Sequence, residues 1–283
     1  MSKSIGVVGA GFVGSAVARG FITFFDVKVY DIKPENATHS IEETIKSDFI
    51  FVCLPTPMER AEGGKCDLSI MRKFFADYKS LDYNPETVLV IKSTIPPGTT
   101  RSIANDYGLQ SQLVHYPEFL TARTATIDFI TPSRHIIGSM EEMPAVKLEN
   151  LLKQRFPSVP CHRMGTEEAE LVKYGCNCFF ATKVMFFNEL KMLIDSMDLN
   201  WNDFLNGVLS DGRIALSHTD VPGHDGDAGY GGSCFPKDVN AIIATMEKMG
   251  LDPKLLKAGW EQNKALRKNW DWAKNESAVS NRE

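Results

Sequence analysis

A glycine-rich turn follows the first apolar run of the chain. Residues 9–14 read Gly-Ala-Gly-Phe-Val-Gly, directly after the run Ser4–Val8 and before a helical segment. Glycines at this spacing permit a tight turn and let backbone N–H groups at a helix N-terminus approach a pyrophosphate closely. The motif alone also fits an ordinary glycine-rich turn, so the neighbouring residues must distinguish a dinucleotide-binding turn from a turn without a ligand. The predicted cofactor contacts in this turn are Gly9, Gly11, Phe12, Val13 and Gly14.

The surroundings include an acidic residue at the expected place. Asp31 stands at the end of the next apolar run, 17 residues past Gly14. A carboxylate there binds the ribose hydroxyls of adenosine and repels a 2′-phosphate, although Lys33 two residues later opposes that repulsion. The alternative is a turn aspartate with no ligand. Because strand, turn, helix and acid fall in register, we expect NAD as the cofactor.

Short, almost continuously apolar runs alternate with helical segments up to about residue 157. Runs of this kind, rich in Val and Ile, are typical of parallel strands buried on both faces. The expected strands are Ser4–Val8, Val27–Tyr30, Phe49–Leu54, Val88–Lys92, Gln112–His115 and His135–Ile137. The predicted fold class is α/β, with a Rossmann-type doubly wound parallel sheet.

The pattern changes at Pro157–Pro160, which we interpret as a domain boundary. We expect an NAD-binding Rossmann domain over 1–160 and an all-helical dimerisation and substrate domain over 161–283. The expected helices are Glu167–Met197 with Thr166 as N-cap, Trp201–Leu209, Pro236–Met249, and Pro253 towards Asn275. The polar residues Ser277–Glu283 are expected to fray.

Composition excludes several classes of function. The chain has 283 residues and a formal net charge of −5, so it lacks the basic excess that nucleic-acid binding requires. We find no signal peptide and no apolar window of the roughly 20 residues that a membrane span needs. A soluble, cytoplasmic protein with no membrane partner is expected. Its six cysteines are expected to be thiols, and no metal site is predicted.

The stretch Gly229–Asp238 carries the clearest chemical signal. It reads Gly-Tyr-Gly-Gly-Ser-Cys-Phe-Pro-Lys-Asp, so Cys234 stands just before a helix whose first turn holds Pro236. The helix dipole and Lys237 should lower the pKa of the Cys234 thiol. A thiolate beside a basic group can attack an aldehyde and later leave from a thioester. The alternative is a buried cysteine in a glycine-rich loop, whose three glycines we expect to pass close to a ligand.

Taken together, these segments resemble the UDP-glucose/GDP-mannose dehydrogenase family, in order along nearly the whole chain. The resembling segments are Gly9–Gly14, Val52–Pro57, Cys66–Ser69, Lys92–Thr99, Tyr116–Leu120 (with Tyr116 in place of the family's asparagine), Lys173 with Asn177, Asn188–Glu189, Asp211–Ile214 and Gly229–Asp238. The resemblance implies oxidation of a sugar C6 alcohol to the acid with two NAD.

The resemblance also implies roles for individual residues. Catalytic residues would be Cys234 as nucleophile, Lys173 and Asn177 as donors to an oxyanion, Asp238 and Thr94 as water-ordering groups, and Glu118 as the base for thioester hydrolysis. Further cofactor contacts would be Pro55, Thr56, Thr94 and Lys237. Substrate contacts would be Glu118, Phe119, Leu120, Lys173, Asn177, Arg213 and Gly231. Spacing alone supports one of these pairs, because Lys173 and Asn177 share a helix face; a solvated lysine and a surface asparagine are the alternative.

The chain departs from the family pattern at two places. Ala122 stands where the family often has a second glutamate, which puts substrate positioning there in doubt. The chain also ends at Glu283, so we expect the family's C-terminal nucleotide-binding domain to be absent. Losing binding energy remote from the reacting carbon should lower the rate as well as the affinity.

Three functions remain open on these grounds. The first is a nucleotide-sugar 6-dehydrogenase that uses Cys234 covalently, binds a small nucleotide-sugar substrate and forms a homodimer through Glu167–Met197. The second is a hydroxyacid dehydrogenase of similar shape, which needs only Lys173 and Asn177. The third is a module that binds NAD or a nucleotide sugar without turnover.

Overall fold

The structure is a computed structural model that describes residues 3–280. It divides into two compact units. The sheet unit comprises the residues up to Thr56 together with Leu68–Lys173, and the helical unit comprises Pro57–Asp67 together with the residues from Tyr174 onward. The predicted boundary at residue 160 differs from this division, because the strand that follows it still belongs to the sheet.

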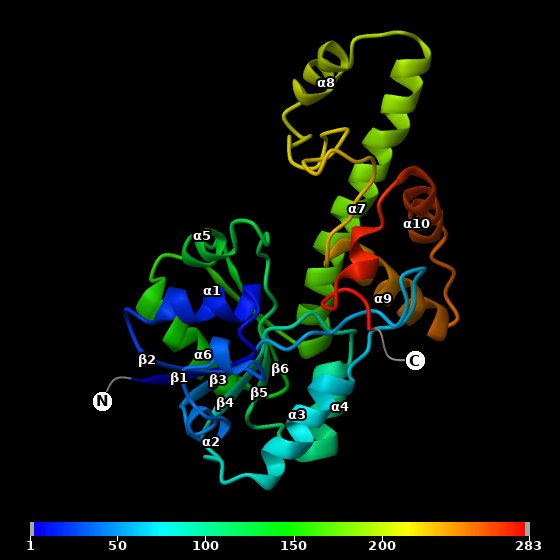
Figure 1. The fold of residues 1–283 in the computed structure, drawn as a ribbon. Coiled ribbons are helices and arrows are strands. Elements are labelled where there is room, and N and C mark those ends of the chain that lie inside the picture. The colour runs from blue at the N-terminus through cyan, green and yellow to red at the C-terminus, as the bar shows by residue number, and fades with distance from the viewer. Residues whose placement is uncertain (1–2, 281–283) are drawn as a thin grey trace. The chain divides into compact units, whose positions relative to one another are not determined.

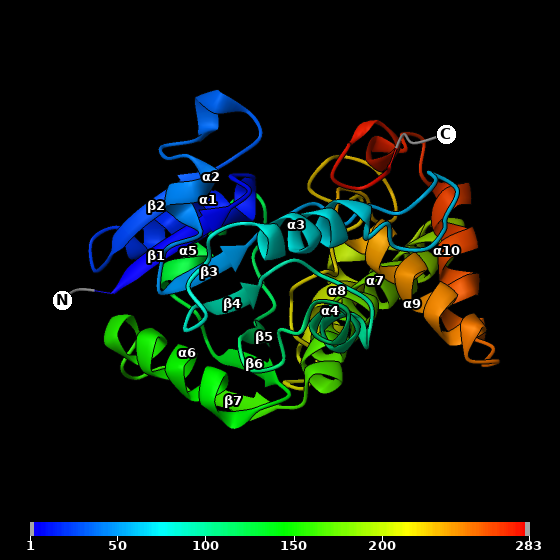
Figure 2. The same ribbon diagram turned by 90° about the horizontal axis from the view of Figure 1, so that it is seen from below.

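The sheet unit contains a seven-stranded sheet in the order β2-β1-β3-β4-β5-β6-β7. Figure 1 labels the strands except β7, which is labelled in Figure 2. The strands are β1 (Ser4–Val8), β2 (Asp26–Tyr30), β3 (Phe49–Val52), β4 (Val88–Ile91), β5 (Leu113–His115), β6 (His135–Ser139) and β7 (Cys161–Met164). Each of the six predicted strands is present, and β1 has the predicted bounds. The predicted Rossmann-type fold is therefore confirmed.

Two features of the sheet differ from the prediction. β5 pairs with β6 in antiparallel orientation, whereas the other neighbouring strands are parallel. An antiparallel neighbour needs no crossover to the opposite edge, and the link from β5 to β6 contains only the six-residue helix α5 (Ala125–Ile130). β7 was not predicted, because its sequence is Cys-His-Arg-Met and lacks the apolar continuity of the inner strands.

Helices cover both faces of the sheet (Figure 2). On one face, α1 (Phe12–Phe21), α5 and α6 (Glu142–Arg155) supply apolar side chains to a core with alternate strand residues such as Val7 and Val90. On the other, α2 (Ile41–Thr44), α3 (Ser69–Ser80) and α4 (Thr99–Tyr107) pack against Val8, Ile91 and their neighbours. Burial on both faces explains why the strand sequences are continuously apolar.

The helical unit is built around α7 (Thr166–Ser196), whose first residues belong to the sheet unit. The other elements are α8 (Trp201–Leu209), α9 (Phe235–Lys248), α10 (Lys254–Leu266) and the 3-10 turn η2 (Asp271–Lys274). Its core joins Cys178, Ala181 and Met185 of α7 to Val239 of α9 and Trp260 of α10. The predicted helices are thus confirmed except for the last, which ends at Leu266 instead of continuing to Asn275.

The end of the described chain was also predicted wrongly in part. Ala278 and Val279 are buried, and Val279 forms a bridge with Met58, so these residues do not fray. Residues 281–283, which the same prediction covered, lie outside the described residues. Within residues 3–280, no helix is both long and apolar enough to cross a membrane.

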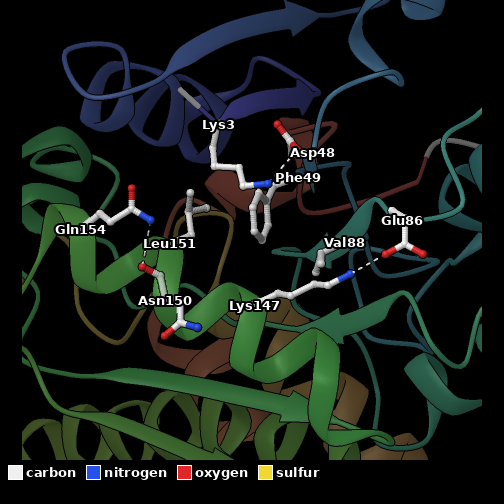
Figure 3. A pocket seen from close by; sticks show the side chains of 9 residues that line it. All are labelled: Lys3, Asp48, Phe49, Glu86, Val88, Lys147, Asn150, Leu151 and Gln154. Carbon is white, nitrogen blue, oxygen red and sulfur yellow. Dashed lines mark hydrogen bonds and ion pairs between the residues drawn. The ribbon is translucent and has the colours of Figure 1, made fainter. Parts of the chain in front are cut away.

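A cavity of about 380 Å³ opens at the amino ends of β1, β3 and β4, beside α6 (Figure 3). Its lining residues are Lys3, Asp48, Phe49, Glu86, Val88, Lys147, Asn150, Leu151 and Gln154. Both lysines are paired there, Lys3 with Asp48 at 3.0 Å and Lys147 with Glu86 at 2.9 Å. Open α/β sheets bind ligands at the carboxyl ends of their strands, and the predicted site residues of the sheet unit lie at that opposite edge.

Candidate active site

The glycine turn between β1 and α1 has the geometry that a dinucleotide requires. Gly9 has a φ of +92°, and a side chain there would come within 2.6 Å of the Cys53 carbonyl oxygen. A Cβ at Gly14 would lie 1.8 Å from the Gly9 carbonyl oxygen. In contrast, a Cβ at Gly11 would meet nothing within 4 Å, and no side chain caps α1 at this residue. Open space therefore lies beside Gly11, where a pyrophosphate can approach the first N–H groups of α1.

Asp31 lies beside this turn. Its carboxylate accepts hydrogen bonds from the backbone N–H groups of Ala10 at 2.6 Å and Lys33 at 2.8 Å. The carboxylate at the end of β2 is thus fixed next to the glycine turn, as binding of an adenosine ribose requires. The residues present therefore fit NAD.

The loops after β3 and β4 lie against each other. The Thr56 hydroxyl donates to the Thr94 carbonyl oxygen at 2.7 Å, and the Ser93 hydroxyl donates to the Leu54 carbonyl oxygen at 2.6 Å. Thr56 and Thr94 are buried, whereas Pro55 is exposed. The structure thus brings together three residues that sequence reasoning assigned to the cofactor loops.

A buried ion pair joins α7 to the loop after β5. The Lys173 ammonium lies 2.9 Å from a Glu118 carboxylate oxygen, and the two side chains are only 4% and 5% exposed. The other Glu118 oxygen accepts the N–H of Leu120 at 2.6 Å. Burial alone would raise the pKa of Glu118, but Lys173, the Leu120 N–H and Lys92 together hold it below its ordinary value. Glu118 is therefore an anion at neutral pH.

Lys92 is a member of this group that sequence reasoning did not single out. Its ammonium donates to the Pro117 carbonyl oxygen at 3.0 Å and lies 3.5 Å from the centre of the Tyr116 ring. Burial lowers the pKa of Lys92 to about 7. The Tyr116 hydroxyl forms a hydrogen bond with the Nδ1 atom of His135 at 2.7 Å. A lysine at the carboxyl end of an otherwise apolar strand was the available signal, since such a charge needs a partner.

Beside Lys92 a cavity of about 240 Å³ opens in the sheet unit. Phe119 and Leu120, two predicted substrate contacts, line it together with Tyr116. The Arg134 guanidinium lies over the Phe119 ring, 4.6 Å from its centre. The loop after β5 thus presents one face to the buried ion pair through Glu118 and another to this cavity.

In the helical unit, Cys234 is the N-cap residue of α9. Its carbonyl oxygen accepts the Asp238 N–H at 3.0 Å, so the thiol stands at the positive end of a fourteen-residue helix. None of the six cysteines, all in the described part of the chain, forms a disulfide. Burial raises the pKa of Cys53 and of Cys178 to about 12, so neither supplies a thiolate at neutral pH.

Three polar side chains gather near Cys234. Asp238, 1% exposed, accepts a hydrogen bond from the Asn177 amide at 2.5 Å and one from the Lys237 ammonium at 2.5 Å. Burial would lower the pKa of Lys237, but the charges of Asp238 and Cys234 raise it above its ordinary value. A fixed cation therefore stands near the thiol. Asn177 comes from α7, one helical turn after Lys173.

Arg213 lies apart from this group. Its guanidinium forms a two-pronged contact with Asp211, at 2.6 and 2.9 Å, and its side chain is 88% exposed. Within the described chain Arg213 thus forms a surface ion pair, the alternative to a substrate contact. Its exposure leaves it available to a neighbouring molecule.

Four further residues hold the loop before Cys234, and sequence reasoning missed three of them. Asn188, quoted only as part of a motif, accepts the Gly229 N–H at 3.0 Å. Asn263 both accepts from and donates to the Tyr230 backbone, at 2.7 and 3.0 Å. Arg267 and Asp271 complete the set. The available signal was that Asn263 and Arg267 follow the apolar Trp260 at helical spacing, on the face that a helical pattern assigns to the core.

The comparisons with known proteins agree with this geometry. Residues 33–155 match the UDP-glucose/GDP-mannose dehydrogenase family, NAD binding domain, and residues 167–265 match the central domain of the same family. Together the two matches cover well over half of the chain. The NAD-binding match and the glycine turn identify NAD as the cofactor.

Individual relatives point the same way. The chain is 32% identical over 233 residues to the UDP-glucose 6-dehydrogenase of Rickettsia bellii, covering 79% of this chain and 50% of that protein. It is 35% identical over 225 residues to that of Pseudomonas aeruginosa, covering 75% and 47%. A UDP-glucose dehydrogenase structure from Pyrobaculum islandicum superposes with a TM-score of 0.81 at 28% identity, covering 94% and 68%.

The chain spans about half the length of the first two relatives. The matches to them run through both halves of this chain, and the two domain matches follow each other in the family's order. The chain therefore belongs to the UDP-glucose/GDP-mannose dehydrogenase family.

Proposed function

We propose that this chain catalyses NAD-dependent oxidation of a nucleotide-sugar C6 alcohol to the carboxylate, with Cys234 as a covalent nucleophile. The observation that carries the proposal is the group at the start of α9. A thiol at the helix N-terminus stands with the ion pair of Lys237 and Asp238, and Asn177 fixes the Asp238 carboxylate. A thiolate stabilised by a helix N-terminus and a nearby cation is suited to attack a carbonyl carbon.

The covalent steps use the chain's own groups. NAD, when bound, accepts the hydride in each of the two oxidations. In the proposed sequence the Cys234 sulfur bonds to the aldehyde carbon, and the carbonyl oxygen receives a proton. After the second oxidation a water attacks the thioester carbon, and the carbon–sulfur bond breaks to release the carboxylate and regenerate the thiolate. Donors aimed at the developing oxyanion stabilise both additions, and we assign this role to Lys173 and Asn177.

The charges of the Lys173–Glu118 pair support different roles for the two residues, with Lys173 as a donor and Glu118 as a proton acceptor. Lys173 is held as a cation by the carboxylate at 2.9 Å, so it can donate a proton or a hydrogen bond to an oxyanion. Glu118 is an ionised carboxylate and can therefore accept a proton from the attacking water. We assign Thr94 and Asp238 to ordering the water that accompanies hydride transfer. Ala122, in place of a second glutamate, leaves the hydrolytic step to Glu118.

We also propose that the chain acts as a homodimer through α7. Phe179, Phe186 and Leu193 recur every seven residues on this helix and are 62%, 55% and 54% exposed. Met197, four residues further, is 58% exposed. A seven-residue repeat of large apolar side chains forms a stripe suited to packing against a second helix. The exposed Arg213 would then be available to the partner's substrate.

A substrate panel tests the reaction. The purified chain is mixed with NAD and each of several UDP- and GDP-sugars, and NADH absorbance is followed to completion with limiting sugar. Two NADH per sugar with carboxylate product are expected for one of them. One NADH per sugar, unchanged in Cys234→Ser, would instead indicate a two-electron hydroxyacid-type dehydrogenase.

The same variant separates catalysis from binding. Cys234→Ser should retain NAD affinity, measured by calorimetry, while two-step oxidation falls by roughly a thousandfold or more, because a neutral hydroxyl is a far weaker nucleophile than a thiolate. Binding of NAD and a nucleotide sugar by well-folded wild-type protein, with no NADH from any sugar, would overturn the proposal in favour of a binding module.

A further inference from the structure

The segment 267–280, which follows α10, is fastened to the loop that precedes Cys234. Asp271 accepts the Gly232 N–H at 2.9 Å and the Arg267 guanidinium at 3.2 Å. Arg267, whose side chain is 2% exposed, also reaches Asp225 at 2.7 Å. The backbone N–H groups of Lys268 and Asn269 donate to Asp227 at 3.2 and 3.0 Å. This segment therefore contacts the loop 225–232 at several points.

Two of the loop's glycines are explained by this contact. A Cβ at Gly231 would lie 2.3 Å from an Asp271 carboxylate oxygen and 2.4 Å from an Arg267 nitrogen. A Cβ at Gly229, whose φ is +70°, would lie 2.3 Å from the Asn263 amide oxygen. We had expected these glycines to admit a ligand, but the space beside them is filled by the chain's own side chains. Gly232, with φ of +76°, faces open space.

The other end of the segment is anchored to the loop 57–67 of the same unit. Trp272, fully buried, donates its indole N–H to the Ala61 carbonyl oxygen at 2.8 Å. Met58 exchanges backbone hydrogen bonds with Ala278 and Ser280, both at 2.8 Å. The Ser280 hydroxyl reaches Asp67 at 2.9 Å. A segment anchored at both ends by buried or backbone contacts has little freedom to move between them.

We propose that segment 267–280 is a strap that positions the Cys234 thiol at the start of α9, with Asp271 as its positioning residue. The inference rests on the proposed function only in taking Cys234 as the nucleophile. Asp271 holds the N–H of Gly232, two residues before Cys234. Gly232 is the point at which the loop turns into α9, and glycine there has the backbone freedom that the strap restricts.

The strap has a chemical consequence at the thiol. A thiol gains thiolate character only while it stays at the helix N-terminus and near the cation of Lys237. Release of Gly232 lets the thiol leave that position, so the pH needed to form the thiolate rises. Charge alone predicts the opposite, because removal of the Asp271 carboxylate takes away a nearby negative charge. The direction of the change therefore distinguishes positioning from a simple electrostatic effect.

The experiment measures alkylation of Cys234 by iodoacetamide between pH 6 and 10, followed by mass spectrometry of the Cys234 peptide. Asp271→Ala should move the midpoint of the pH profile upward by about one unit, which is about tenfold less thiolate at neutral pH. Asp271→Asn should keep the midpoint close to the wild-type value, because its amide oxygen still accepts the Gly232 N–H. Asp252→Ala, at an exposed surface ion pair, is the matched control.

Unfolding is monitored in the same samples. Cys178 is buried and only 9% exposed in the folded chain, so its alkylation reports loss of structure. An upward shift at Cys234 with Cys178 still protected supports the strap. A midpoint that is unchanged or lowered in Asp271→Ala overturns it, and so does an upward shift in Asp271→Asn as large as in Asp271→Ala. Because no sugar is needed, a chain inactive on every substrate refutes the proposed function and leaves this test intact.

Discussion

The ammonium of Lys173 lies 2.9 Å from a carboxylate oxygen of Glu118 in an almost fully buried ion pair. The two residues come from the start of α7 and from the loop after β5, which are separated by 55 positions in the chain. Each charge is costly to bury alone, so each residue fixes the position of the other. This pairing links the helix that carries the two proposed oxyanion donors to the loop that carries the proposed base.

Removal of one partner of this pair should destabilise the fold strongly. Lys173→Ala leaves the Glu118 carboxylate buried without its cation, and a loss of about 3–5 kcal/mol in the free energy of unfolding is expected. Urea unfolding at pH 7 measures it. The double variant Lys173→Met/Glu118→Leu should recover most of the loss, since it leaves no unpaired buried charge. Lys147→Ala, at an exposed pair, should change stability little.

A double variant no more stable than Lys173→Ala would contradict this account, because the loss would then come from packing and not from the unpaired carboxylate. Both variants should be inactive in the substrate panel. The double variant would then be stable but inactive, whereas a purely structural ion pair predicts that activity returns together with stability.

Lys92 should give the fold a distinctive pH dependence. Burial lowers its pKa from 10.5 to about 7, so between these values the unfolded chain binds a proton that the folded chain does not. Stability therefore rises as the pH increases from about 7 towards 10.5, through the contribution of this group. Glu118, Cys53 and Lys173 face Lys92, and Glu118 and Cys53 reduce the shift. Lys92→Met should abolish this rise.

The measurement is urea unfolding of wild type, Lys92→Met and the exposed control Lys73→Met across pH 7 to 10. Other groups titrate in this range in all three proteins, so the difference between each variant and wild type is compared. The difference for Lys73→Met should stay flat. A flat difference for Lys92→Met as well would mean that Lys92 titrates at its ordinary pKa.

Asp31 should set the preference for NAD over NADP. Asp31→Asn keeps an oxygen that accepts the Ala10 N–H but removes the charge that repels a 2′-phosphate. The ratio of NADP to NAD dissociation constants, measured by calorimetry, should fall by about tenfold or more, the equivalent of about 1.4 kcal/mol. Asp26→Asn, exposed at the other end of β2, should leave the ratio unchanged. If the ratio is unchanged in Asp31→Asn, the charge of the Asp31 carboxylate does not determine the preference for NAD.

The local sequence was sufficient to predict the positions of most strands in the sheet. The inner strands are found within one or two residues because burial on both faces requires continuous apolar runs, as in Phe49–Val52. β7 escapes this reasoning because it lies at the sheet's edge and two of its four residues are exposed. Asp31 was predicted from its place at the end of a strand, whereas Thr94 and Glu118 were assigned by the family resemblance; in the structure these three follow strands of one sheet.

Contacts between distant segments could not be predicted. Nothing local to Arg267 ends α10 there, because its neighbours are good helix formers; its backbone becomes extended where its side chain binds the loop 225–232. The same contact fills the space beside Gly231, which the sequence pattern assigned to a ligand. Motif spacing predicts Cys234 as a nucleophile, but the side chains that hold the loop before it come from elsewhere in the chain.

The apolar stripe on α7 should mediate self-association. Phe186 is 55% exposed and lies seven residues from both Phe179 and Leu193, so a charge at Phe186 would fall in the middle of a helix–helix contact. Phe186→Asp should convert a dimer to a monomer in sedimentation velocity at micromolar concentration, because burying an unpaired carboxylate at an interface is unfavourable. Asn105→Asp adds the same charge on the exposed face of α4 and should leave the dimer intact. If Phe186→Asp remains dimeric, the contact lies elsewhere and the stripe has another role.

The exposed Arg213 should contribute to turnover across this contact, provided that the wild-type chain is active. If Arg213 of one protomer contacts the substrate of its partner, the monomeric Phe186→Asp variant should lose turnover. Arg213→Ala should then lose turnover to the same extent while its sedimentation coefficient stays that of the dimer.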